Sequence, residues 1–217
     1  MTAATEVQTG PASIEVDVGR RLMAFNWLTA GYAHRDWLGP WADLLDPRTH
    51  PSLRLLRRVS VVLLERHDLM NRFVRDPGRH TWLLEPQSRL ARMAEVLGTA
   101  MLGGWVRGSL QRQEVALQNK VLGPQRRAQS LRWAQTLKAL PYPGRDGWPV
   151  PLTGNAAVSR LGVSCLVALP EAGSGAAERT AMRFPLGTVV PLQLNGAQRD
   201  EALALLYGVS EEWGAAS

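Results

Sequence analysis

The chain has 217 residues, of which 45% are hydrophobic and 20% are charged. This length and balance are typical of one large domain, or of two small domains sharing a core, and they exclude a wholly disordered chain. The formal net charge is +6, and all 25 basic residues except Lys120 and Lys138 are arginine. Such a basic chain either binds nucleic acid or anionic lipid, or uses arginine as helix surface, and the even spread of the arginines favours the second interpretation.

The chain carries one cysteine, Cys165, so it has no internal disulfide framework and fits a reducing compartment. The N-terminal sequence MTAATEVQTG lacks the basic residues and the apolar stretch of a secretory signal. The longest apolar windows, 93–106 and 161–170, fall short of the roughly 18 residues that a membrane crossing needs. These features predict a cytoplasmic protein.

Small and polar residues dominate positions 1–18, which predicts a flexible N-terminal tail. A short helix is expected to follow from Arg20 to His34. Its apolar side would carry Leu22, Phe25 and Leu28, which recur at helical spacing.

The segment Leu53–Arg75, with the sequence LRLLRRVSVVLLERHDLMNRFVR, predicts a long amphipathic helix. Its apolar residues gather on one side when they are placed at 3.6 residues per turn. The opposite, charged side includes Arg54, Arg58, Arg72 and Arg75. The sequence Asp76-Pro77-Gly78 is typical of a helix end, so the helix is expected to stop there.

A third helix is expected to begin at Ser88 as its N-cap. Its inward side would carry Leu90, Met93, Leu97 and Met101. Glycines then interrupt the helical pattern at Gly98, Gly103, Gly104 and Gly108. Each glycine costs up to about 1 kcal/mol relative to alanine. The pattern therefore predicts either a break near Gly103 and Gly104 or a place where another helix backbone approaches closely.

Two further amphipathic helices are expected at 106–121 and 125–140, separated by Leu122-Gly123-Pro124. Residues 141–155, with the sequence PYPGRDGWPVPLTGN, contain four prolines and three glycines. This composition predicts a hinge-like loop, which Tyr142 and Trp148 would pin to the body.

Residues 156–169 predict a buried helix, and Ala181–Pro185 a short strand within a small β-hairpin near residues 181–193. Asn195 is expected to cap a closing helix through Tyr207, and residues 211–217 to form a C-terminal tail. The predicted fold is therefore mostly α-helical, with a single helical domain over residues 19–210 and room for that one hairpin.

No stretch combines the residue types of a catalytic or cofactor site. The four histidines, His34, His50, His67 and His80, lack HExxH spacing, and a CxxC pair is absent, so no metal site is predicted. A deep pocket that holds His67 or His80 beside a carboxylate would instead indicate a helical enzyme. The sequence predicts a protein without catalytic activity, metal or cofactor.

Candidate partner-binding residues are tryptophans and arginines, because both types are enriched at binding hot spots. Three tryptophans lie in loop-like sequence, where they are not expected to be buried between helices. The arginines come from the charged side of the 53–75 helix. The complete candidate set is Trp37, Trp41, Arg54, Arg58, Arg72, Arg75 and Trp148.

Two stretches of the chain resemble one protein family. Leu53–Arg75 resembles the central helix of the SctK proteins, the YscK, PscK and HrpB-type accessory component of bacterial type III secretion. Arg160–Gly187, RLGVSCLVALPEAGSGAAERTAMRFPLG, resembles the closing signature of that family. There an apolar helix ends in a Leu-Pro turn, and a short basic helix and an alternating arginine/apolar segment ending in proline follow. The resemblance covers most of residues 40 to 190.

The resemblance implies a non-enzymatic cytoplasmic adaptor of the sorting platform, needed for substrate loading and export. It implies two partners, the pod protein (SctQ-like) and the cytoplasmic domain of the inner-membrane ring protein (SctD-like), with the membrane reached only through them. The family motifs define no partner-contact residues that transfer to this chain. The alternative from the residues alone is a basic helical nucleic-acid-binding regulator, whose affinity would fall steeply with salt.

Overall fold

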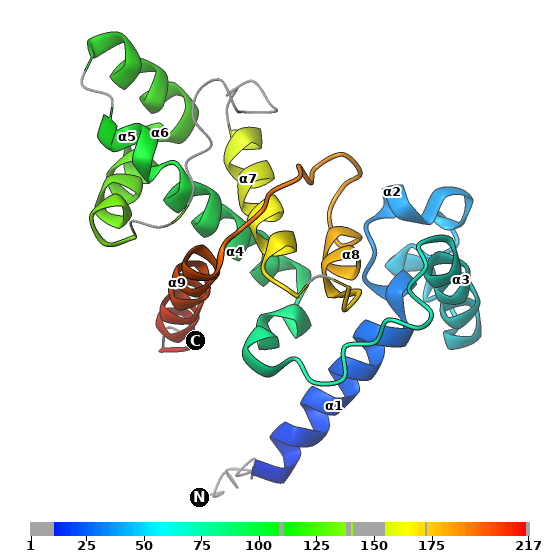
Figure 1. Ribbon diagram of the computed structural model, residues 1–217. Coiled ribbons are helices and arrows are strands. Elements are labelled where there is room, and N and C mark those ends of the chain that lie inside the picture. Colours follow the sequence, from blue (N-terminus) through cyan, green and yellow to red (C-terminus); the bar gives the residue numbers. More distant parts are fainter. Residues whose placement is uncertain (1–10, 109–110, 138–139, 141–154, 172, 216–217) are drawn as a thin grey trace, which may run out of the picture.

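The computed structural model describes residues 11–108, 111–137, 140, 155–171 and 173–215, and all statements about structure below concern these residues. They form nine α-helices and four short 3₁₀ helices, η1 to η4, with no strand (Figure 1). The α-helices are α1 (Pro11–Trp27), α2 (Arg35–Leu38), α3 (Leu53–Arg66), α4 (Gln87–Met101), α5 (Gly103–Gly108), α6 (Arg112–Thr136), α7 (Asn155–Ala168), α8 (Ala176–Ala181) and α9 (Gly196–Ala215). The predicted mostly α-helical fold is confirmed.

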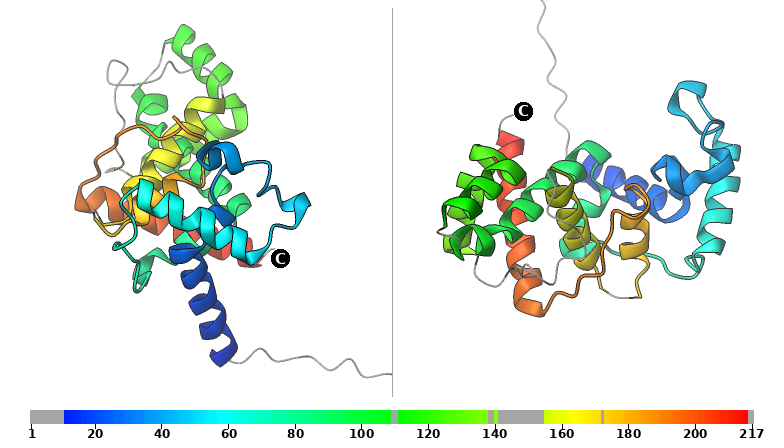
Figure 2. Two further views of the ribbon diagram at one scale, coloured as in Figure 1. Left: turned by 90° about the vertical axis from the view of Figure 1, so that its right-hand side faces the viewer. Right: turned by 90° about the horizontal axis from the view of Figure 1, so that it is seen from above.

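Helix α1 begins at Pro11, inside the segment expected to be a tail, and ends at Trp27. Proline is well suited to a first helical turn because its missing N–H would have no partner there. Leu28, expected inside this helix, has a non-helical backbone, and the 3₁₀ helix η1 (Thr29–Gly31) follows. The beginning of α1 projects from the body in two perpendicular views (Figures 1 and 2).

Helix α3 begins as expected but ends at Arg66 rather than Arg75. The Ser52 side chain caps its first turn by accepting a hydrogen bond from the Leu55 N–H (3.2 Å). Asp68 adopts a left-handed backbone with φ of 53°, which turns the chain out of the helix. The remaining apolar residues of the 53–75 pattern therefore belong to a loop.

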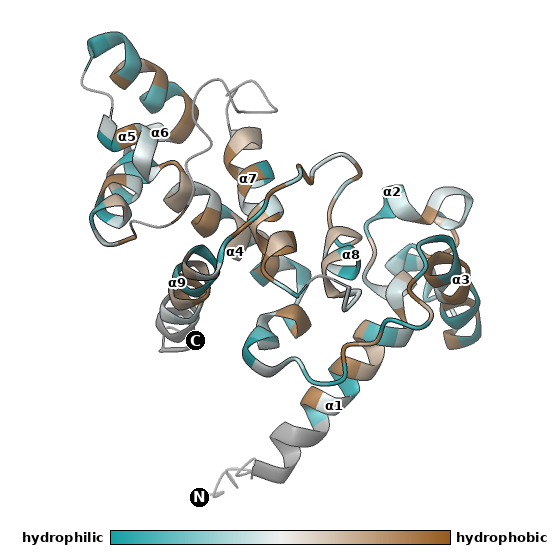
Figure 3. Cartoon of the chain, in the orientation of Figure 1, coloured by the Kyte–Doolittle hydropathy of each residue, from teal (hydrophilic) through white to brown (hydrophobic). Residues whose placement is uncertain are grey.

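The main core lies where α4 crosses α7. All four α4 residues expected to face inward are buried, namely Leu90, Met93, Leu97 and Met101. The helix starts after Pro86, however, so Ser88 is not its N-cap. Figure 3 shows hydrophobic residues along α7, which confirms the buried helix predicted near residues 156–169.

Glycine determines how closely α4 and α7 approach. A Cβ atom added to Gly98 would overlap the carbonyl oxygen of Val158, and one added to Gly162 would overlap that of Ala94. The close-approach alternative predicted for Gly98 is thus confirmed. The break predicted near Gly103 is also present, because α4 ends at Met101 and α5 begins at Gly103.

Helix α6 combines the two amphipathic segments expected on either side of Gly123. Gly123 has φ of 74° and Pro124 follows it, so the helix is kinked at the predicted breaking point. The second half of α6 is fastened to α4 by the buried Ser130 hydroxyl, which donates to the Thr99 carbonyl (2.8 Å). The hinge-like loop predicted at 141–155 lies outside the described residues, except for Asn155, the first residue of α7.

Helix α8 carries a fully buried arginine, Arg179, which lies between α1 and the loop after α3. The guanidinium of Arg179 donates to the carbonyls of Arg72 (2.6 Å), Leu69 (3.1 Å), Gly175 (3.2 Å) and Asn26 (3.4 Å). The Asn26 side chain in turn exchanges two hydrogen bonds with the backbone of Val74. One side chain therefore ties α1, the loop after α3 and α8 together.

Arg183 fastens the same segment to η4 (Gly78–Leu84). Its guanidinium donates to the carbonyls of Leu83 (2.9 Å) and Glu85 (2.6 Å) and lies over the Tyr32 ring (5.3 Å). Burial lowers the pKa of Arg183 to about 10, so the group is still charged at neutral pH. The same environment raises the pKa of Tyr32 to about 12, chiefly through burial.

The β-hairpin expected near residues 181–193 is not confirmed, because this segment contains no strand. Arg183 and Phe184 are consecutive and both buried after α8, so the segment does not alternate between a buried and an exposed face as a strand would. Farther along, the Val190 N–H donates to the Ser164 hydroxyl of α7 (2.8 Å) rather than to a partner strand. The segment is thus held by side chains.

Asn195 caps the final helix as predicted. Its side chain accepts from the Gln198 N–H (3.0 Å), and the Gln198 side chain accepts from the Asn195 N–H (2.9 Å). This reciprocal pair is a capping box, which satisfies two backbone donors at the start of α9. The helix continues beyond Tyr207 to Ala215, into the segment expected to be a C-terminal tail.

Candidate functional site

The two described candidate tryptophans are half-buried. The Trp37 indole N–H donates to the Phe184 carbonyl (2.8 Å), and its ring meets the edge of His67 with centroids 5.3 Å apart. Trp41, in the 3₁₀ helix η2 (Gly39–Trp41), packs against the small apolar cluster formed by α3 and its neighbours. Both side chains contribute to the fold, and their role in partner binding stays a prediction. Trp148 lies outside the described residues.

The four candidate arginines do not share one helix face. Arg54 and Arg58 lie on the exposed side of α3, as expected. Arg72 and Arg75 belong to the loop beyond the helix end. Arg72 pairs with Asp68 (3.1 Å), although no helix connects them, and with Glu178 of α8 (3.0 Å).

A groove between α1 and α3 is lined mostly by apolar side chains. It has a volume of about 660 Å³, and its lining consists of Gly19, Arg20, Met23, Ala24, Trp27, Leu28, Arg57 and Val61. Met23 is 62% exposed, Trp27 42% and Val61 38%. Exposed apolar side chains that are grouped in this way mark interaction sites more often than isolated ones do.

Sequence reasoning missed this groove. It assigned Leu22 and Phe25 to the core side of the first helix, and these residues do pack there. Met23 and Trp27 stand one turn apart on a neighbouring side of the same helix. This second apolar stripe is the feature of the sequence that could have predicted the groove. The exposed Val61 of α3 lies across the groove from it.

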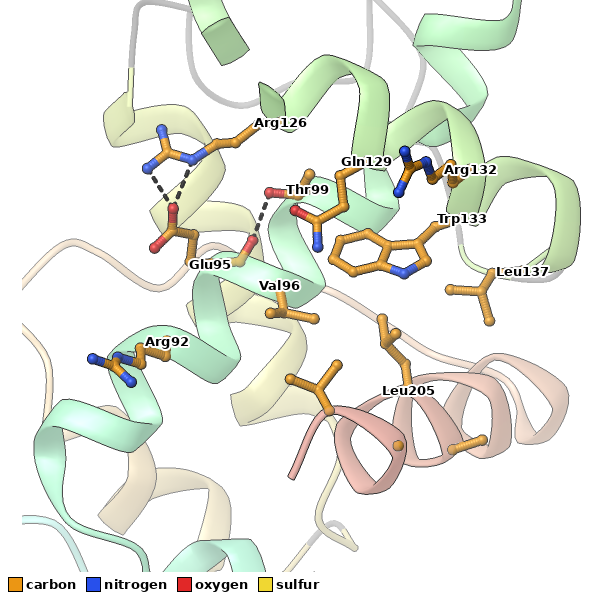
Figure 4. Close-up of a pocket in the computed structure, with 13 residues that line it drawn as sticks. Arg92, Glu95, Val96, Thr99, Arg126, Gln129, Arg132, Trp133, Leu137 and Leu205 are labelled. Atoms are coloured by element: carbon orange, nitrogen blue, oxygen red, sulfur yellow. Dashed lines mark hydrogen bonds and ion pairs between the residues drawn. The ribbon is translucent and has the colours of Figure 1, made fainter. Parts of the chain in front are cut away.

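A second pocket lies between α4, α6 and α9 (Figure 4), with a volume of about 820 Å³. Trp133 and Leu205 form an apolar wall, and Arg92 and Arg132 add positive charge. Arg126 also lines this pocket and forms an ion pair with Glu95, in which its Nε lies 2.6 Å from the carboxylate. The pocket therefore offers mixed apolar and polar contacts.

The two surfaces lie on opposite sides of the molecule. Figures 1 and 2 place α3 at one end of the body and α6 with α9 at the other. The α4–α7 crossing stands between them as a packed core. A partner bound at one surface would leave the other open.

Several of the arginines already have partners within the chain. Arg21, Arg35, Arg72, Arg79, Arg89 and Arg126 each form an ion pair with a carboxylate. Arg179 and Arg183 are buried among backbone carbonyls. This distribution does not favour the nucleic-acid alternative, which needs arginines gathered on one face.

Neither His67 nor His80 has a carboxylate in hydrogen-bond contact within the described part of the chain. Burial is the main cause that lowers the pKa of both imidazoles, and each has a neighbouring arginine that adds to the effect. His80 stands edge-on to Trp82, with ring centroids 6.2 Å apart. The described residues contain no group of three or more His, Cys, Asp and Glu side chains placed to hold a metal ion.

The lowered pKa of His80 predicts a loss of stability in acid. The unfolded chain takes up a proton as pH falls below about 6.5, whereas the folded chain resists it until a lower pH. We therefore expect the urea midpoint of unfolding to fall between pH 7 and pH 5, and to fall less in His80→Gln. The two proteins are compared by the slope of the urea midpoint against pH. A change in stability that the substitution causes equally at every pH does not alter this slope. An unchanged slope in the variant would contradict the prediction.

None of the helices within the described ranges is both long enough and apolar enough to cross a lipid bilayer. A search among curated proteins and a search among solved structures returned no match. The sequence model of one family does match, that of YOP proteins translocation protein K (YscK), over residues 22–214. This match spans nearly the whole chain and agrees with the resemblance seen at Leu53–Arg75 and Arg160–Gly187. The chain therefore belongs to the YscK family, the SctK proteins of type III secretion, and is a protein of the export machinery.

Proposed function

We propose that the protein is a non-enzymatic adaptor that bridges two components of the secretion apparatus. One partner is the cytoplasmic domain of the inner-membrane ring protein (SctD-like), and the other is the pod protein (SctQ-like). The adaptor would work on the cytoplasmic face of the apparatus and meet the membrane only through these partners. A rigid helical body would fix the distance and the angle between them, and export would depend on that geometry.

The observation that supports bridging is the separation of two candidate surfaces by one packed core. The groove between α1 and α3 and the pocket between α4, α6 and α9 lie on opposite sides of the α4–α7 crossing. Two partners could therefore bind without competing for space. The residues expected from the sequence stay proposed as additional contacts, because none of the described ones lines either surface: Trp37, Trp41, Arg54, Arg58, Arg72, Arg75 and Trp148.

The test is a titration of the full-length chain with each purified partner, first alone and then after saturation with the other. We expect each partner to bind, and the second to bind about as tightly in the presence of the first as in its absence. Size-exclusion chromatography with light scattering should then detect a ternary complex. Competition between the partners, or failure of the folded protein to bind either one, would contradict bridging.

A further inference from the structure

We propose that the groove between α1 and α3 binds an acidic amphipathic helix of a partner protein. This inference rests on the proposed adaptor function and assigns one of its two partners to a defined surface. Four properties of the groove support it: its apolar floor, its basic rim, its two-helix walls and the open space above Gly19.

The apolar side chains of the floor are not covered by the packing of this chain. On α1, Met23 and Trp27 leave much of their surface exposed, although Phe25, between them in sequence, is buried in the core. Trp27 packs one side of its indole on Phe73, with ring centroids 4.6 Å apart, which fixes the ring in place. Across the groove, Val61 of α3 is exposed although its neighbour Ser60 is buried. A preordered apolar floor lowers the entropic cost of binding a partner.

The rim is positively charged. Arg20 of α1 and Arg57 of α3 line the groove from opposite walls. Within Leu53–Arg66, the chain carries four arginines and one glutamate, so helix α3 as a whole has a net positive charge, and Arg57 is its residue in the groove. On the α1 side, Asp17 pairs with Arg21 (2.6 Å). The charge that complements this rim is negative.

The shape of the groove fits a helix. Its walls are two helices, and a third helix laid between them would complete an ordinary three-helix packing arrangement. The floor from Gly19 to Trp27 extends about 12 Å at the rise of an α-helix, which corresponds to apolar anchors at positions i, i+3 or i+4, and i+7 of the partner. Gly19 has no atom within 4 Å of an added Cβ, so a partner side chain has room there.

Two other occupants fit less well. A second copy of this chain would bring one arginine-lined rim against another, which is unfavourable for like charges. An anionic membrane would match the charge, but a flat surface does not fill a concave groove between two helices. Both alternatives are outcomes of the experiment below.

The test uses two pairs of variants of the full-length chain. Met23→Glu places a charge on the groove floor, and its control is Leu186→Glu, at a side chain 54% exposed away from the groove. Arg57→Glu reverses a rim charge, and its control is Arg112→Glu, at an exposed position in α6. Each protein is titrated with the purified ring-protein domain and with the pod protein at two salt concentrations, after circular dichroism has verified folding.

We expect Met23→Glu to lower the affinity for one partner by about tenfold or more and to leave the affinity for the other unchanged. Arg57→Glu should lower the affinity for the same partner, and that affinity should then depend less on salt concentration. The controls should behave as wild type. Photo-crosslinking from position 23 should then capture a helical segment of that partner with net negative charge and apolar residues at helical spacing.

Four results would overturn the inference. In the first, both partners bind Met23→Glu and wild type equally well, which leaves the adaptor function intact. In the second, the crosslinked segment is neutral or basic. In the third, wild type dimerises and Met23→Glu is monomeric. In the fourth, vesicles containing phosphatidylglycerol bind wild type but not Met23→Glu, while both partners bind the variant normally. Failure of wild type to bind either partner would instead overturn the adaptor function itself.

Discussion

Replacement of Gly162 by alanine is expected to destabilise the protein by about 3 kcal/mol or more, because overpacking at this position meets backbone rather than a flexible side chain. The new Cβ would overlap the carbonyl oxygen of Ala94, so α4 and α7 would have to separate. Separation would loosen the contacts between the buried side chains of both helices, which include Leu97 and Leu166. Because a domain is stable by only about 5–15 kcal/mol, this loss is a large fraction of the total.

The measurement is urea unfolding followed by far-ultraviolet circular dichroism. The matched control is Gly19→Ala, the same substitution in α1, where an added Cβ meets no atom within 4 Å. Alanine is a better helix former than glycine by up to about 1 kcal/mol, so the control should raise stability. Equal urea midpoints for Gly162→Ala and wild type would show that the two helices tolerate a wider separation.

Replacement of Arg179 by methionine is expected to cost about 3–5 kcal/mol, because each buried carbonyl left without a donor costs about 1–3 kcal/mol. The substitution retains the apolar volume but leaves the carbonyls of Asn26, Leu69, Arg72 and Gly175 without their shared donor. Lysine should restore only part of the loss, because an ammonium group cannot match the planar fork of a guanidinium.

The loss should appear locally as well as globally. Hydrogen exchange and limited proteolysis should become faster in the loop after α3, near Arg72, because Arg179 holds that loop. The exposed Arg112 provides the control, and Arg112→Met should change neither measurement. An Arg179→Met protein as stable as wild type would mean that water satisfies the four carbonyls.

The helical class and most helix positions could be predicted because they depend on local signals. Asn195 lies before an apolar run and caps it, and Gly123-Pro124 breaks α6 where glycine and proline follow one another. The α4 residues that recur at helical spacing are buried. Each of these outcomes follows from residues close together in the sequence.

The end of α3 could not be predicted from local signals. The apolar spacing continues through Leu69 and Phe73, and neither proline nor glycine occurs between Arg66 and Pro77. Asp68 turns the chain out of the helix, and the loop that follows is held by Arg179, more than 100 residues later, which donates to the carbonyls of Leu69 and Arg72. In a continuing helix, those carbonyls would accept bonds from residues four positions farther along.

The candidate surfaces were not predicted, for the same reason, although the exposure of two candidate residues was. Arg54 and Arg58 depend only on the α3 pattern, and both are exposed as expected. The groove depends on how α1 lies beside α3, which involves η1 and the Ser60 hydroxyl that accepts from the Ala30 N–H (3.0 Å). No local pattern in the sequence contains that arrangement.

The position of Arg179 has a consequence for synthesis on the ribosome. α1 and the loop after α3 are translated early, yet the side chain that joins them emerges only after most of the chain has been made. Contacts of such large sequence separation slow folding, and partly folded chains expose apolar surface until they form. The nascent N-terminal half should therefore be a client for chaperones until α8 has left the exit tunnel.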